Sequence, residues 1–289
     1  MKILITGKDG QVGWELQRTL STLGEVIAHD RHGLDLANPD SIRQAIRSAK
    51  PDLIINAAAY TAVDKAESEP ELAMAINGIA PGIMAEEAKK MGAALIHYST
   101  DYVFDGTKPA PYVEQDVTNP LNVYGKTKLA GEDAVKAAGC PFLILRTSWV
   151  YGGRGKNFLL TMLRLAGERD KLSIVADQTG APTWSRMIAE ATAQIVAQRK
   201  SGLSDLHGLF HLSATGSTSW HGFTEAILSN RNVSEVSARP QLLPISTAEY
   251  PLPAARPMNS RLSCGSLQQA FGLELPAWDV SLRLCMADL

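Results

Sequence analysis

The sequence predicts an α/β protein with a doubly wound parallel sheet followed by a smaller α/β lobe. Three observations predict this fold class. Short apolar runs alternate with helical segments through the first half of the chain, a glycine-rich segment separates the first run from the first helix, and the regularity weakens beyond Trp149. With 289 residues, 45% of them hydrophobic, the chain is long enough for one large domain and a second lobe.

Five runs in the first half have the composition of buried strands, because they are short, rich in Leu, Ile and Val, and bounded by Gly, Pro or Asp. They cover residues 2–6, 25–29, 52–56, 93–99 and 142–146. Four segments between them have helical spacing, over residues 11–22, 41–49, 69–91 and 124–138. This alternation predicts a parallel sheet with helices on both faces. Strands covered on both faces read as nearly continuous apolar runs.

The weaker pattern beyond Trp149 predicts a first domain of residues 1–149 and a second lobe of residues 150–289. Helices are expected over 157–167, 185–199 and 220–228. A strand is expected over 172–175, with a further apolar run at 208–212 and a proline-dense stretch at 240–257. We expect some of these segments to return and pack on the first domain.

Composition excludes several classes of partner and compartment. The formal net charge is only -2, which argues against nucleic acid or an anionic membrane as the main partner. The three cysteines, Cys140, Cys264 and Cys285, have no repeated spacing, so reduced thiols are expected. We see no signal peptide and no apolar run of about 20 residues, so the sequence predicts a cytoplasmic protein.

A glycine-rich segment, Gly-Lys-Asp-Gly-Gln-Val-Gly, occupies residues 7–13, directly after the first strand and before the first helix. Glycines there permit a tight turn and close approach of the backbone to a pyrophosphate, which the free N–H groups at the helix start attract. The spacing differs from the common G-x-G-x-x-G, and an ordinary strand–helix turn is the alternative. We therefore predict a Rossmann-type dinucleotide site with contacts from Gly7, Gly10, Gln11, Val12 and Gly13.

The end of the second strand bears on the choice of cofactor. Asp30 is placed to accept a hydrogen bond from a ribose hydroxyl, which suits NADH. Its neighbour Arg31 is placed to face the 2′-phosphate of NADPH, so the choice between the two cofactors stays open. Either side chain also fits plain surface charge. Asp35 and Leu36 lie just beyond, where a loop reaches toward an adenine ring.

Small residues follow the third strand. Ala57, Ala58 and Ala59 precede Tyr60, and small side chains at the carboxyl end of a strand leave room for a flat ligand over the sheet edge. A close contact with a helix is the alternative interpretation. We count these four residues, with Thr61, among the expected cofactor contacts.

Tyr124 and Lys128 stand four residues apart at the start of a predicted helix, so they share one face. A phenol has an ordinary pKa of about 10, and a neighbouring ammonium lowers it toward the range useful for proton transfer. Alone, the pair fits an exposed helix face equally well. Thr100 ends the fourth strand at the same sheet edge as the glycine segment, where its hydroxyl is placed to donate to a substrate oxygen.

Together these motifs indicate a resemblance to a known family. The glycine spacing, residues 56–59, Ser99-Thr100 and Tyr124-x-x-x-Lys128 resemble the extended short-chain dehydrogenase/reductase family. Longer blocks at 56–67, 99–106, 146–152 and 256–262 are similar to the dTDP-4-dehydrorhamnose reductase family within it.

The resemblance implies a hydride transfer from NADPH or NADH to C4 of dTDP-4-dehydro-β-L-rhamnose, giving dTDP-L-rhamnose for cell-surface polysaccharide synthesis. It implies that Tyr124 donates the proton, that Lys128 tunes Tyr124 and binds the nicotinamide ribose, and that Thr100 polarises the ketone. The cofactor carries the difficult chemistry, and protein groups supply orientation and proton transfer.

The resemblance also implies residues around the dTDP-sugar substrate. They are Thr61, Val63, Thr100, Asp101, Tyr102, Trp149, Arg256 and Asn259. An indole face suits a deoxysugar and a guanidinium suits a diphosphate. Core packing of Trp149 and a lobe-stabilising ion pair of Arg256 are the alternatives.

Some members of this family form dimers around a magnesium ion held by carboxylates. Glu15 is compatible with such a site, but Arg186 stands where an acidic partner is expected. No histidine has metal-type spacing either. We therefore predict no metal, and the sequence leaves a homodimer open.

Two rival interpretations remain at this point. One is a nucleotide-sugar epimerase or dehydratase, which retains its cofactor through a full cycle where a reductase consumes it. The other is a non-catalytic protein similar to the regulatory subunits of methionine adenosyltransferase, and the intact set of Thr100, Tyr124 and Lys128 argues against it.

Overall fold

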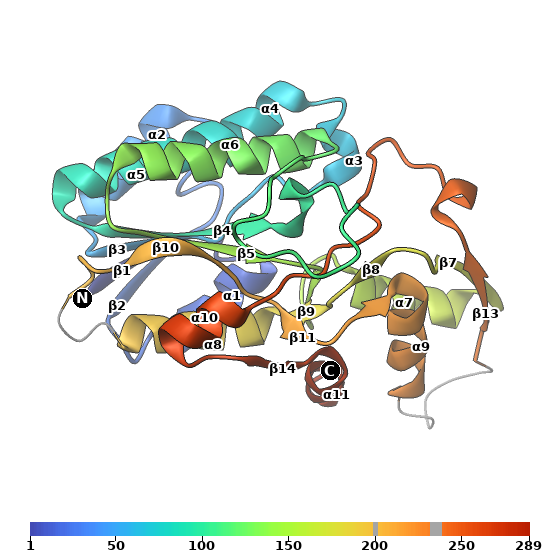
Figure 1. The fold of residues 1–289 in the computed structure, drawn as a ribbon. Helices are drawn as coiled ribbons and strands as arrows, with labels where there is room; N and C mark the ends of the chain where they lie inside the picture. Colours follow the sequence, from blue (N-terminus) through green and yellow to red (C-terminus); the bar gives the residue numbers. More distant parts are fainter. Residues whose placement is uncertain (199–201, 232–238) are drawn as a thin grey trace.

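The computed structural model describes residues 1–198, 202–231 and 239–289. Its centre is a six-stranded parallel sheet with helices on both faces, and a smaller lobe lies beyond the carboxyl ends of the strands (Figure 1). The fold class predicted from the sequence is confirmed. The division between residues 149 and 150 stays a prediction.

The central sheet has the strand order β10-β5-β4-β3-β1-β2, and all its neighbours are parallel. The bounds are β1 Lys2–Thr6, β2 Glu25–His29, β3 Leu53–Asn56, β4 Ala94–Thr100, β5 Phe142–Thr147 and β10 His207–His211. The first five agree with the expected strands to within one residue. The chain order reverses between β1 and β3, and ligands of such sheets bind at the carboxyl ends of the strands beside that point.

Alternating side chains of the strands build a core on each face of the sheet. Ile3 and Ile5 pack toward α1 (Gln11–Thr19) and α8 (Ser185–Ala197), whereas Leu4 packs toward the opposite face. That face is covered by α2 (Pro39–Ala49), α5 (Ala80–Met91) and α6 (Val123–Ala138), which run side by side in Figure 1. The period-two pattern of the strands thus places the helices on both faces.

The expected helix over 69–91 is interrupted in the structure. It consists of α4 (Pro70–Met74), a π-helical turn η1 (Ala75–Ile79) and α5. Pro81 has no N–H to donate back to the preceding turn, and a π turn accommodates such a break. The turn places Asn77 against the chain that leaves β3: its side chain bonds both the N–H (2.8 Å) and the carbonyl (3.1 Å) of Tyr60.

The second lobe has its own core, formed by Tyr151, Leu159, Trp184, Phe223 and Leu282. Around it lie α7 (Phe158–Glu168), α9 (Trp220–Ser229), α11 (Trp278–Ala287) and the parallel pair β7 (Lys171–Val175) with β13 (Gln241–Ile245). Short two-stranded pairs connect it to the sheet: β6 (Val150–Tyr151) with β9 (Thr183–Trp184), β8 (Thr179–Gly180) with β12 (Thr218–Ser219), and β11 (Ala214–Thr215) with β14 (Leu275–Ala277).

Several elements differ from expectation. The proline-dense stretch contains β13 and the 3-10 turn η4 (Thr247–Glu249), while α3 (Val63–Ala66), α10 (Gly265–Phe271) and α11 were not expected. The expected helix over 185–199 ends at Ala197, and its last expected residue lies outside the described residues.

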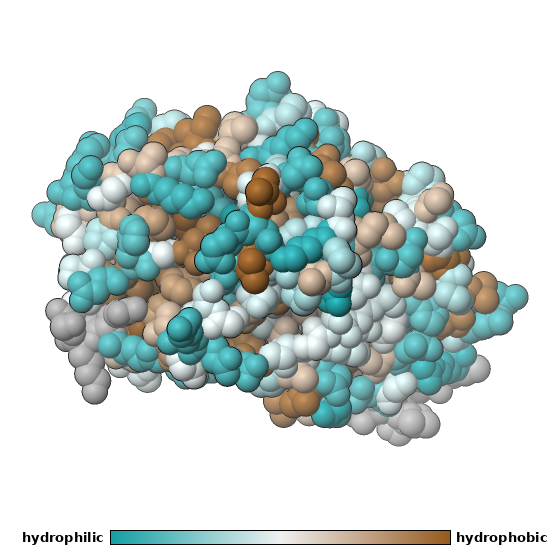
Figure 2. All heavy atoms as spheres, viewed as in Figure 1, coloured by the Kyte–Doolittle hydropathy of each residue, from teal (hydrophilic) through white to brown (hydrophobic). Residues whose placement is uncertain are grey.

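The surface is mostly hydrophilic on the face drawn in Figure 2, with hydrophobic side chains in small separate patches. Within the described ranges, no helix has the length and apolar composition to span a bilayer. The same residues contain no group of three or more His, Cys, Asp or Glu side chains arranged to hold a metal ion.

Candidate active site

The glycine segment forms a tight turn between β1 and α1. Gly7 has φ +70°, and the Gly10 N–H donates to its carbonyl at 2.9 Å. A Cβ on Gly13 would lie 2.1 Å from the Gly7 carbonyl, so this position must be glycine. A Cβ on Gly10 would meet only that carbonyl, at 3.2 Å. The outer side of the loop is thus open to a ligand.

The helix that follows is suited to an anion. Gly10 caps α1 without a side-chain hydrogen bond, and the first turn has no acidic residue. The N–H groups at the helix start and the helix dipole therefore favour a phosphate there. Gln11 turns away from this end toward the second lobe, and its amide lies 3.4 Å from the Val150 carbonyl. Val12 packs against the core below the loop.

Asp30 is firmly ionised. Its carboxylate accepts N–H groups of Gly33 (3.0 Å) and His32 (2.9 Å) and pairs with Lys8 at 3.0 Å. These contacts, the Gly33 hydrogen bond first, lower its pKa to about 2. The Arg31 side chain is 76% exposed and lies 3.9 Å from Asp35, so it is free to turn toward a ligand.

Leu36, which was expected near an adenine ring, lies buried beneath α2 with Ile42 and Ile46. Its backbone and the neighbouring Asp35 remain at the loop beyond β2, where the Asp35 carboxylate accepts the Ala37 N–H at 3.0 Å. The expected role of Leu36 in cofactor binding stays a prediction.

The segment after β3 lies against the glycine turn. A Cβ on Gly7 would come within 3.0 Å of Ala58, and the Ala58 N–H donates to Thr6 Oγ1 at 3.2 Å. Ala57, Ala58, Ala59 and Tyr60 are all partly exposed here, Thr61 is exposed, and Val63 begins α3 half-buried. The expected small-residue floor therefore lies beside the expected pyrophosphate loop.

Tyr124 sits in the first turn of α6, which is capped by Asn122. Its ring meets the Tyr102 ring edge-on, with centroids 5.6 Å apart. Burial raises the pKa of Tyr124 to about 12, the hydrogen bond with Thr100 opposes this, and the charge of Asp101 adds to it. The sequence predicted that Lys128 would lower this pKa. In the structure burial has the larger effect and the pKa is raised.

Lys128 is 2% exposed, and its ammonium group points at the sheet. Nζ lies 2.6 Å from the Tyr98 carbonyl and 3.2 Å from His97 Nε2. Burial lowers the pKa of Lys128 to about 8, although the charge of Glu132 raises it. Lys128 therefore exchanges its proton near neutral pH, and its charge is directed at β4 and not at the phenol.

Thr100 ends β4 at the expected sheet edge. Its hydroxyl accepts the Tyr102 N–H (3.2 Å) and donates to the Asp101 carboxylate (3.0 Å). Burial raises the pKa of Asp101 to about 6, against the hydrogen bonds from Ser260 and Thr100. The two residues thus form a buried hydroxyl–carboxyl pair next to Tyr124.

Trp149 follows β5 in a strained conformation with φ +47°. Its indole stacks on that of Trp220, with centroids 3.5 Å apart and planes 7° apart. Gly180 makes room for the stack, because a Cβ there would lie 2.4 Å from the Trp149 ring. A non-glycine residue held at positive φ is typical of functional sites.

A cavity of about 700 Å³ opens in the second lobe on the far side of Trp220. Its lining combines aromatic rings with cations and includes Phe158, Arg169, Lys171, Trp220, Tyr250 and Arg256. A nucleoside diphosphate presents a flat base and two negative phosphates, which match this combination.

Arg256 forms a bidentate ion pair with Asp64 of α3, at 2.9 and 2.7 Å. The alternative of a lobe-stabilising pair is therefore present, and the same side chain also lines the cavity. The Asn259 side chain donates to the carbonyls of Lys108 (2.6 Å) and Ala110 (2.9 Å) and accepts from Arg261. In this structure Asn259 holds the chain in place, and its expected contact with substrate stays a prediction.

Glu15 is buried and faces two guanidinium groups. Arg18 contacts it from the next turn, and Arg186 of α8 lies 3.4 Å away while also pairing with Asp288. Arg186 thus supplies the positive charge between the two carboxylates.

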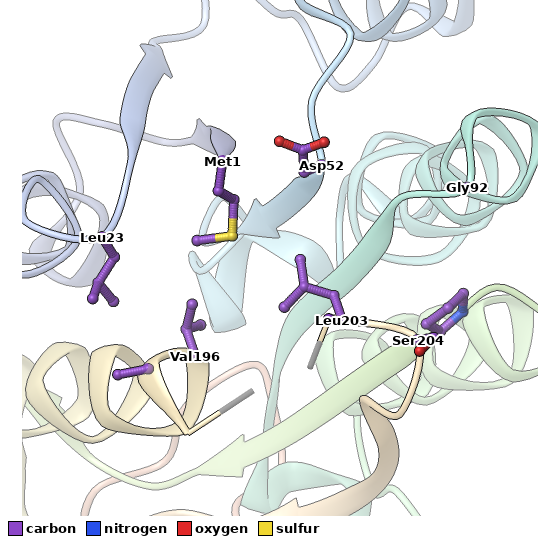
Figure 3. A pocket seen from close by; sticks show the side chains of 10 residues that line it. Met1, Leu23, Asp52, Gly92, Val196, Leu203 and Ser204 are labelled. Carbon is purple, nitrogen blue, oxygen red and sulfur yellow. The ribbon is translucent and has the colours of Figure 1, made fainter. Parts of the chain in front are cut away.

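A second cavity, of about 540 Å³, lies at the opposite edge of the sheet. Figure 3 shows Met1, Asp52 and Gly92, which precede β1, β3 and β4, around it, with Val196 of α8 and Leu203 of the segment before β10. Because ligands of doubly wound sheets bind at the carboxyl ends of the strands, this cavity is not the candidate site.

Sequence reasoning missed Asn77, Trp220 and Asp64. Asn77 could have been noticed, because it is a polar residue four positions before Pro81 in an otherwise helical run. The meaning of Trp220 and Asp64 depends on tertiary partners more than 70 residues away, and no local pattern contains that information.

The sheet edge that holds an open glycine turn and the set of Thr100, Tyr124 and Lys128 defines a class: nicotinamide-dependent reductases and epimerases of the short-chain type. The chain belongs to one family of that class, because the family model described as RmlD substrate binding domain matches residues 1–289. The chain is 50% identical to dTDP-4-dehydrorhamnose reductase of Burkholderia thailandensis, over 100% of this chain and 99% of the relative.

Solved structures agree with this assignment. A dTDP-4-dehydrorhamnose reductase from Bacillus anthracis in complex with NADP superposes with a TM-score of 0.92 at 37% identity, covering 100% of this chain and 99% of that one. A UDP-glucose 4-epimerase from Thermus thermophilus in complex with NAD has a TM-score of 0.82 at 19% identity, over 99% of this chain and 98% of that one. The second likeness shows the fold alone.

Proposed function

We propose that this protein is a nicotinamide-dependent reductase that converts dTDP-4-dehydro-β-L-rhamnose to dTDP-L-rhamnose. The observation that carries the proposal is the set of buried Thr100, half-buried Tyr124 and buried Lys128 at the carboxyl edge of the sheet. Its support from relatives is the 50% identity to a reductase of that name over the full chain.

NADPH or NADH fits the residues present. The turn of Gly7, Gly10 and Gly13 leaves an open side without a Cβ, and the uncapped start of α1 attracts the pyrophosphate. Asp30 is ionised and suits a ribose hydroxyl, whereas Arg31 is exposed and suits a 2′-phosphate. When bound, the reduced nicotinamide supplies a hydride to the ketone carbon.

The protein's own groups manage the proton. The Tyr124 hydroxyl donates its proton to the oxygen at C4 as the carbonyl becomes a hydroxyl. A phenol whose pKa is about 12 stays protonated until that oxygen becomes strongly basic. Thr100 orients the Tyr124 hydroxyl, and Lys128, one turn further along α6 with a pKa of about 8, is a proton source near neutral pH for the phenol to regain its proton.

The nucleotide part fits the lobe cavity. Phe158 and Trp220 offer flat faces to a base, and Lys171 and Arg256 offer positive charge to the diphosphate. The Trp149 indole, stacked on Trp220, then lies between this cavity and the catalytic set, where an apolar face suits the 6-deoxysugar.

The decisive experiment is product analysis after incubation with dTDP-4-dehydrorhamnose and each reduced cofactor. Stoichiometric loss of nicotinamide absorbance with an L-rhamnose product supports the proposal. Turnover without net consumption of cofactor would identify an epimerase. Cofactor binding without turnover, together with a co-purifying protein partner, would favour the non-catalytic interpretation.

A cytoplasmic location accords with the proposal, because Cys140, Cys264 and Cys285 are all free thiols. Light scattering of the purified protein tests the homodimer that the sequence left open.

A further inference from the structure

His97 lies in β4, fully buried, with a polar neighbour at each ring nitrogen. Nδ1 is 3.0 Å from the side-chain nitrogen of Asn56 on β3, and Nε2 is 3.2 Å from Nζ of Lys128 on α6. Burial lowers the pKa of His97 well below 6.5, and the charge of Lys128 lowers it further. The ring is therefore neutral at physiological pH and has one N–H and one lone pair.

A chain of hydrogen bonds across three adjacent strands decides which nitrogen carries the hydrogen. The Ala58 N–H donates to Thr6 Oγ1 (3.2 Å), and the Thr6 hydroxyl donates to Asn56 Oδ1 (2.7 Å). Asn56 therefore presents its N–H groups to His97 Nδ1, which accepts. The ring hydrogen is then on Nε2, facing Lys128.

Reversing this chain of hydrogen bonds is less favourable. The Asn56 amide would then be rotated, and Thr6 Oγ1 would face two N–H donors, from Ala58 and from Asn56. The Thr6 hydroxyl hydrogen would lose Asn56 Oδ1 as its acceptor. Thr6 is 1% exposed, so water does not readily replace the lost partner. This series of hydrogen bonds thus starts at the backbone of Ala58, beside the glycine turn, and ends at Lys128.

We propose that His97 is a positioning residue for Lys128: its Nε2–H donates to the lysine nitrogen and so favours the uncharged amine over the ammonium ion. The inference rests on the proposed function, in which Lys128 serves Tyr124. An amine donates one hydrogen to the Tyr98 carbonyl and turns its lone pair to His97. An ammonium ion has no lone pair and would set N–H against N–H.

The other ionisable groups near Lys128 do not duplicate this effect. Glu132, one turn further along α6, favours the ammonium form. Its charge is largely compensated by Arg146 of β5, which donates to it at 2.8 and 2.7 Å, and by Lys136 at 3.5 Å.

On the other side of Lys128, Tyr124 of α6 and Asp101 of η2 (Asp101–Val103) lie toward the open end of the site. Neither forms a hydrogen bond with Nζ, which contacts the Tyr98 carbonyl and His97. Among the described residues around Nζ, His97 is therefore the neutral donor that acts against the ammonium form.

This arrangement has a consequence for the proton supply. After Tyr124 gives its proton to the substrate oxygen, the Lys128 ammonium is a proton source for the phenolate, and a bridging group carries the proton because Nζ and the phenol share no hydrogen bond. His97 keeps its own proton throughout. A lysine held by acceptors alone would be a weaker acid and would resupply the phenol more slowly.

The tautomer can be measured directly. Long-range ¹H–¹⁵N spectra of protein with ¹⁵N-labelled histidine rings distinguish the two neutral forms, and His97→Gln assigns the signals. We expect the neutral Nε2–H form at pH 7 and still at pH 6.5, the ordinary pKa of histidine. An Nδ1–H ring, or a charged ring at pH 7, would overturn the inference.

The lysine is measured in the same way, by ¹³C NMR of labelled lysine Cε, with Lys128→Met for assignment. His97→Gln removes the ring, whereas Thr6→Val keeps the ring and its packing but removes the hydroxyl that orients Asn56. In both variants we expect the titration midpoint of Lys128 to rise by about one pH unit, the worth of one hydrogen bond.

Tyr98→Phe is the matched control. Tyr98 adjoins His97 and is similarly buried, but its hydroxyl bonds Thr192 at 2.7 Å on the other face of the sheet. Its loss should leave the Lys128 midpoint unchanged. An unchanged midpoint in Thr6→Val and His97→Gln as well would show that His97 only fills space.

Steady-state kinetics adds a functional readout. The alkaline limb of the pH profile for kcat should move upward in His97→Gln and Thr6→Val and stay in place in Tyr98→Phe. Should the protein fail to turn over the dTDP-sugar at all, the proposed function fails, while the two NMR titrations still decide the role of His97.

Discussion

The ion pair between Asp64 and Arg256 is expected to hold the wall of the lobe cavity, and Asp64→Asn tests this. The guanidinium donates to both carboxylate oxygens and to the Ala254 carbonyl at 2.8 Å, and the Ala254 N–H returns to Asp64 at 3.2 Å. Asp64 belongs to α3, which follows β3, and Ala254 and Arg256 line the cavity. The pair therefore ties the sheet edge to the expected nucleotide site.

The burial of the two side chains determines how much the ion pair contributes to the free energy of unfolding. An exposed ion pair contributes about 0.2–1 kcal/mol, and hydrogen bonds to a charged group away from water contribute about 1.5–3 kcal/mol. The side chains are 38% exposed for Asp64 and 18% for Arg256, which places the pair between these cases. Asparagine keeps the shape and one acceptor, so we expect a loss of about 1 kcal/mol in the free energy of unfolding. If the free energy of substrate binding falls by the same amount, about 1 kcal/mol, KM for the dTDP-sugar rises about fivefold.

Urea unfolding and steady-state kinetics measure these two quantities. Asp279→Asn is the control, because Asp279 forms a similar pair with Arg283 at 3.0 Å on α11, outside the cavity lining. The control should lose at most a few tenths of a kcal/mol, with KM unchanged. Equal KM values for Asp64→Asn and the natural protein would refute the role of the pair at the cavity.

The same pair predicts a pH dependence of stability. The hydrogen bond from Arg256 lowers the pKa of Asp64 below its ordinary 3.8, although partial burial opposes this. A carboxyl whose pKa is lower in the folded state stabilises the fold above its unfolded pKa, and that contribution is lost as pH falls through the folded value. The difference in unfolding free energy between the natural protein and Asp64→Asn should therefore be constant near neutrality and close only below about pH 4.

Three other outcomes are expected. Tyr124→Phe should lower kcat by roughly 10²–10⁴-fold while fluorescence titration finds cofactor affinity unchanged, and near-normal turnover would remove Tyr124 from its role as proton donor. Arg31→Ala should raise KM for NADPH about tenfold and spare KM for NADH, because charge-assisted hydrogen bonds to the 2′-phosphate are lost; equal changes would contradict that contact. Dialysis against a chelator should leave kcat and Tm unchanged, because Arg186 already faces Glu15; a large loss reversed by magnesium would overturn this.

The central sheet was predictable because its strands are apolar on both faces and each carries its own signal. All five strands expected in the first half are present to within one residue, and the glycine turn lies at the reversal of strand order. The sixth strand, His207–His211, pairs with β5 from more than 60 residues away. A pairing at that separation is set by tertiary packing, so the sequence indicated only an apolar run.

The candidate site was predictable where a motif fixes backbone position and less so where partners fix chemistry. Thr100 and Tyr124 lie together as expected, because one ends a strand and the other begins the helix above it. Asn259 was expected to face substrate, yet its amide is engaged by the carbonyls of Lys108 and Ala110. His97 read as an ordinary strand residue, because its neighbours Asn56 and Lys128 come from separate elements.

Helix α6 shows how the division between spacing and chemistry arises. Tyr124, Lys128 and Glu132 recur every four residues, so the helix sets a single stripe against the sheet. The sheet then gives each member of the stripe a different environment. The hydroxyl of Thr100 meets the phenol, the ring of His97 faces the lysine nitrogen, and the guanidinium of Arg146 pairs with the carboxylate.

A pattern of Tyr and Lys four residues apart therefore does not by itself set the acidity of either group. On this sheet burial raises the pKa of Tyr124 to about 12 and lowers that of Lys128 to about 8. The two pKa values move apart from their ordinary values of 10.0 and 10.5, since burial disfavours both the phenolate and the ammonium. The phenol therefore keeps its proton until the substrate oxygen becomes strongly basic, whereas Lys128 holds the more acidic proton of the two groups.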